Sequence, residues 1–130
     1  LARGAHATAD RVRGASPRFG AALVNDGDPA TYWATDDGVT AGAIDLEWST
    51  EVVIDRVVVQ EAIALGQRVE AWTVEVEADG GWRQVAAATT IGARRLVRFP
   101  ETATRRIRVA ITKARACPVI AAVSAYRDPA

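Results

Sequence analysis

The chain has 130 residues, of which 49% are apolar and 25% are charged. These are the proportions of one globular domain, which we expect to span residues 1–130, and they exclude a disordered or fibrous chain. Sixteen Lys and Arg residues balance sixteen Asp and Glu residues, so we expect neither nucleic acid nor an anionic membrane as partner. One histidine, His6, and one cysteine, Cys117, leave little material for a catalytic triad, an internal disulfide or a zinc site. The composition therefore favours a module that binds over one that reacts.

The predicted elements are short β-strands. In residues 44–48 and 68–78 apolar side chains alternate with polar ones, which is the period of a half-buried strand. Asp79-Gly80-Gly81 supplies the turn of a hairpin, because glycine accepts positive φ without a Cβ clash. In chain order the expected strands are residues 5–9, 44–48, 52–60, 68–78, 82–87, 94–99, 105–112 and 119–126. This succession predicts an all-β sandwich or jelly roll.

Residues 23–33 form the most informative predicted loop. Within it, Asp26-Gly27-Asp28-Pro29 has the composition of a turn. The loop also offers carbonyl, carboxylate and hydroxyl groups, which are the hard oxygen ligands that Ca²⁺ accepts. Its spacing is not that of an EF-hand. These residues alone fit both a plain Asx-turn and a metal-binding loop.

Three short motifs occur in a recognisable order along the chain. They are residues 25–33 (NDGDPATYW), residues 44–46 (IDL), and Trp72 followed by Gly81-Trp82. Together they resemble the discoidin domain, also called the coagulation factor 5/8 type C domain or carbohydrate-binding module family 32. The resemblance implies an eight-stranded antiparallel jelly-roll β-sandwich of the galactose-binding-domain-like type.

A narrower resemblance is carried by three further stretches. Residues 60–69, 89–92 and 113–118 are together similar to the C-terminal discoidin-like domain of family 29 α-L-fucosidases. The resemblance implies that the parent chain is an α-L-fucosidase, whose catalytic carboxylates lie in a different domain. We therefore expect this domain to be non-catalytic and monomeric. As part of a secreted enzyme it would be extracellular or periplasmic, and the cysteine usage leaves the cytoplasm open.

The discoidin resemblance also implies a structural Ca²⁺ beside the loop of residues 23–33. The implied ligands in this sequence are groups of Leu23, Asp26, Asp28, Thr31 and Ala121. The family pattern continues with a Glu after the position of Ala121, where this chain has Ala122. Because the loss of a carboxylate weakens a site for a hard cation, a monovalent ion, a water molecule or an empty loop remain alternatives to Ca²⁺.

The discoidin resemblance also implies a shallow ligand site among the loops at one end of the sandwich. Its polar candidates are Gln60, Glu61, Gln67, Arg68, Arg94 and Arg95, with Lys113 and Arg115 nearby. The four tryptophans, Trp33, Trp48, Trp72 and Trp82, are expected in the core. Without an aromatic platform, such a site would bind fucose- or galactose-type glycans weakly.

The same loops allow a second interpretation, in which they dock on the catalytic barrel of the parent enzyme. Ile63 and Leu65 carry aliphatic side chains that suit a protein interface, and an ion pair between Glu61 and Arg68 would hold the loop in shape. A third interpretation, an enzyme that uses Asp36-Asp37, lacks a nucleophile with a neighbouring base.

Overall fold

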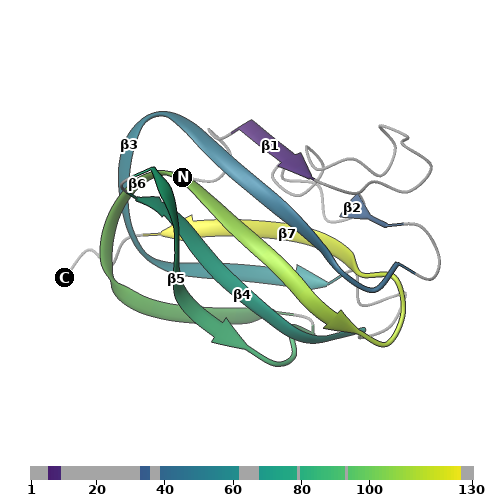
Figure 1. Ribbon diagram of the computed structural model, residues 1–130. Coiled ribbons are helices and arrows are strands. Elements are labelled where there is room, and N and C mark those ends of the chain that lie inside the picture. Colours follow the sequence, from purple (N-terminus) through teal and green to yellow (C-terminus); the bar gives the residue numbers. More distant parts are fainter. Residues whose placement is uncertain are drawn as a thin grey trace.

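The computed structural model describes residues 6–9, 33–35, 39–61, 68–78, 80–92 and 94–126. In this part of the chain all regular structure is β-strand, and every strand pair is antiparallel (Figure 1). The strands are β1 (His6–Ala9), β2 (Trp33–Ala34), β3 (Gly42–Glu61), β4 (Val69–Ala78), β5 (Gly81–Ala88), β6 (Arg95–Ala114) and β7 (Val119–Tyr126). None of these residues belongs to a helix that is long and apolar enough to cross a membrane. The predicted all-β fold is confirmed.

The strands β3 and β6 are 20 residues long, and each contributes to two layers. In the five-stranded layer the order is β1–β3–β6–β4–β5, and residues 42–47 of β3 pair with residues 106–111 of β6. In the four-stranded layer the order is β2–β7–β3–β6, and residues 52–59 pair with residues 95–104. Both long strands bend between their halves, at the left of the view in Figure 1. The bends fold one continuous sheet into a sandwich.

The observed strands differ from the eight predicted ones at these bends. Residues 44–48 and 52–60 form the single strand β3, and residues 94–99 and 105–112 form the single strand β6. Polar, exposed residues at the bend of β3, such as Ser49 and Thr50, interrupt the hydrophobic pattern although the backbone stays extended. At the bend of β6 the hydroxyl of buried Thr104 donates to the carbonyl of Glu77 at 3.1 Å. The two-residue strand β2 is too short to show a period in the sequence.

The core lies between the two layers. It combines Ile44, Leu46, Val74 and Ile107 of the five-stranded layer with residues such as Val57 of the four-stranded layer. Three of the tryptophans, Trp33, Trp48 and Trp72, are buried there, as predicted. The prediction for Trp82 is wrong, because this residue is only partly buried and lies against two arginine side chains. Strand β5 contains no fully buried residue, and its contacts with the core come from Val85, Ala86 and Ala88, whereas Trp82 is paired in register with exposed Glu77.

Candidate functional site

The structure brings the described candidates for ligand binding to one end of the sandwich, at the right of Figure 1. Gln60 and Glu61 end β3, Arg68 directly precedes β4, and Arg94 and Arg95 lie at the start of β6. The backbone of Glu61 donates to the carbonyl of Gly92 at 3.0 Å, and the backbone of Arg115 donates to the carbonyl of Arg68 at 2.9 Å. These bonds tie together the three loops that resemble those of fucosidases. Gln67, Ile63 and Leu65 lie outside the described residues.

Glu61 is the centre of this end of the molecule. Its side chain is buried, with 4% of the residue exposed. One carboxylate oxygen accepts the backbone N–H groups of Arg68 and Val69 at 2.8 and 2.9 Å, and the other accepts the N–H of Gly92 at 2.8 Å. Gly92 has a φ of 68°, a backbone conformation that favours glycine. Its N–H donates to the Glu61 carboxylate, and its carbonyl accepts the backbone N–H of Glu61. A single carboxylate therefore fixes the start of β4 and the loop before β6.

Arg68 connects this arrangement to the loop before β7. One terminal nitrogen of its guanidinium group lies 3.0 Å from the carbonyl oxygen of Cys117 and 3.1 Å from its sulfur, and Cys117 is buried. The contact of Arg68 with Glu61 runs through its backbone N–H, not through the guanidinium group that the sequence suggested for an ion pair. We call Glu61, Arg68, Val69, Gly92 and Cys117 the loop anchor.

The residues that a ligand could contact beside the loop anchor are not members of the loop anchor itself. Arg94 and Arg95 are exposed at the start of β6, and Gln60 is partly buried opposite Ala122 of β7. Leu96 follows them and is 37% exposed, the one large exposed apolar residue among those described. Two guanidinium groups and an amide supply hydrogen-bond donors that can engage the hydroxyl oxygens of a sugar. The assignment of Gln60, Glu61, Gln67, Arg68, Arg94 and Arg95 to a ligand site stays a prediction.

The predicted calcium site lies almost wholly outside the described part of the chain. Leu23, Asp26, Asp28 and Thr31 belong to residues that the structure does not describe. Ala121 is 8% exposed on β7 and offers only its backbone carbonyl, and its neighbour Ala122 offers no carboxylate. Among the residues described, no group of three or more His, Cys, Asp or Glu side chains could hold a metal ion. Calcium therefore remains a prediction for this chain.

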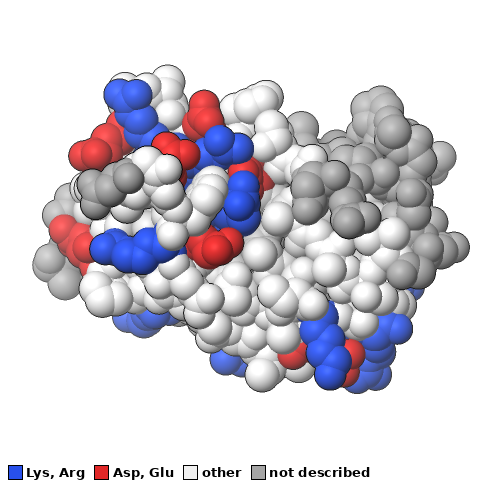
Figure 2. Space-filling view, in the orientation of Figure 1, with Lys and Arg blue, Asp and Glu red and all other residues white. Residues whose placement is uncertain are grey.

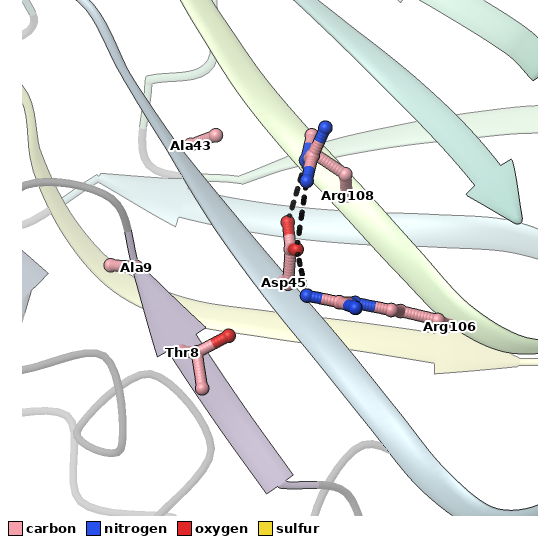
Figure 3. A pocket seen from close by; sticks show the side chains of 6 residues that line it. All are labelled: Thr8, Ala9, Ala43, Asp45, Arg106 and Arg108. Carbon is pink, nitrogen blue, oxygen red and sulfur yellow. Dashed lines mark hydrogen bonds and ion pairs between the residues drawn. The ribbon is translucent and has the colours of Figure 1, made fainter. Parts of the chain in front are cut away.

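A second group of polar side chains lies on the outer face of the five-stranded layer. Asp45 of β3 is paired in register with Arg108 of β6 and with Thr8 of β1. Its carboxylate accepts bonds from Arg108 Nε at 2.8 Å and from Arg106 Nη2 at 2.8 Å (Figure 3). The indole of Trp82 lies beneath both arginines, with its ring centre 4.1 Å from Arg108 Cζ and 5.5 Å from Arg106 Cζ. We call Thr8, Asp45, Trp82, Arg106 and Arg108 the outer-face cluster.

Sequence reasoning missed this cluster. The alternation of Arg106 and Arg108 with Ile107 and Val109 correctly predicts the polar face of a half-buried strand. That pattern does not show that both arginines converge on one acid. The available signal is Asp45, an acidic residue between two apolar ones in a strand, but its partners are 61 and 63 residues away.

Comparison with known proteins assigns the fold to a family. The family model of the F5/8 type C domain matches residues 6–123. The chain belongs to this family. This F5/8 type C domain is also similar to α-L-fucosidase 1 of Arabidopsis thaliana, with 30% identity over 98% of the chain and 26% of the plant protein. Both resemblances noted in the sequence are thus confirmed.

Solved structures give the same result. The GH29 fucosidase of Ruminococcus gnavus in complex with fucose matches with a TM-score of 0.87 and 34% identity, over 98% of this chain and 26% of that one. Chitosan-binding module 1 of a chitosanase/glucanase from Paenibacillus sp. IK-5 shares the fold, with a TM-score of 0.83, 23% identity and 96% of both chains covered. This F5/8 type C domain therefore spans about a quarter of the length of the fucosidases it matches.

Proposed function

We propose that this F5/8 type C domain is a non-catalytic carbohydrate-binding module of an α-L-fucosidase, with fucose- or galactose-type glycans as ligands. The observation that carries the proposal is the match of almost the whole chain to about a quarter of each fucosidase. The remaining three quarters of such a protein leave room for a separate catalytic domain. The module would then hold the enzyme near its glycan while the reaction takes place elsewhere.

The geometry of the loop anchor supports a binding role at this end. Binding is favoured when the contacting loops are already held in place, because less ordering is needed on association. Glu61 supplies that order through three bonds to backbone N–H groups, and Arg68 extends it to Cys117. Arg94 and Arg95 stay exposed beside it and would donate hydrogen bonds to sugar hydroxyls.

The same geometry supports a non-catalytic role. A general acid or base needs a carboxyl group that can reach the substrate. The carboxylate of Glu61 is buried and is already engaged by three backbone N–H groups. Arginine stays protonated and serves poorly as a proton donor or acceptor, so Arg68, Arg94 and Arg95 are suited to binding alone.

The test is a calorimetric titration of the domain with methyl α-L-fucopyranoside and with methyl β-D-galactopyranoside. We expect affinity for at least one of them with a Kd of about 1 mM, equivalent to about −4 kcal/mol. The double variant Arg94→Ala/Arg95→Ala should weaken it about tenfold, because charged donors to the sugar are lost. The matched control Arg83→Ala/Arg105→Ala removes two exposed arginines elsewhere and should leave the affinity unchanged.

A second candidate function is favoured by Leu96. Its 37% exposure beside Arg94 and Arg95 suits a contact with another protein domain, since interfaces combine apolar side chains with arginine. In that case the loops would dock on the catalytic domain and bind no sugar of their own. Titrations that give no heat with either sugar, at concentrations well above the millimolar range, would contradict the binding role and favour docking.

A further inference from the structure

The outer-face cluster lies far from the loop anchor. Arg108 is six residues from Ala114, the residue at which β6 reaches the loop end. Six residues of extended strand correspond to about 20 Å. A ligand seated on this face would therefore be distinct from one held by Arg94 and Arg95.

The face is hollowed beside Asp45. A depression of about 380 Å³ is lined by Thr8, Ala9, Ala43, Asp45, Arg106 and Arg108. Figure 3 shows Thr8 and Ala9 of β1 on one side of Asp45 and the two guanidinium groups on the other. The alanines keep the depression open because their side chains end at one methyl group. Its volume falls in the range of small-molecule sites.

The hydrogen-bonding groups of the depression are held in place before any ligand arrives. Asp45 accepts three N–H bonds from the two arginines, at 2.8, 2.8 and 3.1 Å. The indole of Trp82 supports both guanidinium groups from the side of β5, in a contact that favours a cation over the ring. The side chains of Arg106 and Arg108 nevertheless stay 33% and 31% exposed, so a ligand can reach them.

The charges around the depression favour a neutral ligand. The guanidinium groups of Arg106 and Arg108 face the carboxylates of Asp45 and Glu47, and Glu75 of β4 is paired in register with Arg108. Figure 2 shows basic and acidic side chains interleaved over the part of this face where β3, β6, β4 and β5 run in Figure 1. Positive charge is thus already balanced, so an anion would gain little. Neutral hydroxyl groups both donate to carboxylates and accept from guanidinium groups.

We propose that the outer-face cluster is a second glycan-binding site, which takes a neutral oligosaccharide in the depression between Thr8 and the two guanidinium groups. The sugar hydroxyls accept bonds from Arg106 and Arg108 and donate to the hydroxyl of Thr8, while Asp45 holds the two guanidinium groups in place. Trp82 is a positioning residue that holds the two arginines. The ligand class rests on the proposed function, whereas the location rests on the geometry of this face.

The experiment is a ¹H–¹⁵N NMR titration of the domain, since the Paenibacillus module shows that a chain of this length can hold the fold by itself. The probes are the neutral trisaccharide 2′-fucosyllactose and the acidic trisaccharide 3′-sialyllactose. We expect 2′-fucosyllactose to shift the Nε–H signals of Arg106 and Arg108 and the indole signal of Trp82. 3′-Sialyllactose should leave them in place.

A variant that fills the depression provides the matched comparison. Thr8→Trp adds bulk at an exposed position of β1 without removing a member of the Asp45 network, and Thr50→Trp adds the same bulk at the exposed bend of β3. Thr8→Trp should raise the Kd at the outer face at least tenfold, and Thr50→Trp should not change it. Shifts confined to Gly92, Arg94 and Arg95 would overturn this inference and leave the proposed function standing. Stronger binding of 3′-sialyllactose, or no shift of the arginine signals, would overturn it as well.

Discussion

Glu61→Gln is expected to lower the free energy of unfolding by about 3 kcal/mol, although it replaces a single oxygen by an NH₂ group. The buried carboxylate accepts three backbone N–H bonds, at 2.8, 2.9 and 2.8 Å. An amide keeps one accepting oxygen and turns its nitrogen toward at least one N–H donor. Both the lost charge-assisted bonds and the unpaired buried donors destabilise the fold. Urea denaturation measures the effect.

The control for this prediction is Glu51→Gln, which makes the same chemical change at an exposed position in the bend of β3. Its effect should stay within about 0.5 kcal/mol, as for most surface substitutions. Hydrogen exchange adds a local measure. The N–H groups of Arg68, Val69 and Gly92 should exchange faster in Glu61→Gln than in the unchanged domain, and they should not exchange faster in Glu51→Gln. Equal stabilities of the two variants would show that the carboxylate of Glu61 does not hold the loops.

Asp45→Asn is the second substitution with a large expected effect, a loss of about 3 kcal/mol in the free energy of unfolding. Its carboxylate is 10% exposed and binds both Arg106 and Arg108. Without the negative charge, two partly buried guanidinium groups on the same face repel each other, and the amide keeps only one oxygen to accept the N–H bonds that two carboxylate oxygens accepted. Thermal or urea unfolding at moderate ionic strength checks the result.

Glu47→Gln is the matched control for Asp45→Asn. Glu47 lies two residues further along the same strand and pairs with the same Arg106, but it is 57% exposed and its oxygen is 3.8 Å from the nitrogen. Solvent and salt screen such a pair, so its removal should cost less than about 1 kcal/mol. If Asp45→Asn and Glu47→Gln destabilise the domain equally, burial of Asp45 does not determine the strength of the cluster.

Much of the fold could be predicted from the sequence because its strands follow simple periods. The alternation in residues 68–78 correctly places Trp72, Val74 and Val76 in the core. The hairpin turn is also correct, and Gly80 has the positive φ, 79°, that the turn requires. The bends of β3 and β6 could not be predicted, because exposed polar residues look alike in a bent strand and in a loop.

The candidate sites could be predicted only in part, since their contacts depend on register between distant segments. The position of Glu61 at the loop end follows from the sequence, but its inward orientation depends on Gly92, which is 31 residues away. The partners of Asp45 depend in the same way on the pairing of β3 with β6. Trp82 was misplaced because it is paired in register with exposed Glu77 and lies against Arg106 and Arg108, not against the core. Contacts between side chains on different strands can be identified only when the pairing of those strands is known.

We propose that this F5/8 type C domain binds sugar without cleaving it. One measurement tests both parts: titration of the ¹⁵N-labelled domain with 4-nitrophenyl α-L-fucopyranoside, while the absorbance of released nitrophenol is followed in the same tube. We predict saturable shifts of amide signals and no release of nitrophenol above the rate of the buffer. Release that depends on the domain would contradict the non-catalytic role, and the lack of any shift at concentrations well above the millimolar range would contradict sugar binding.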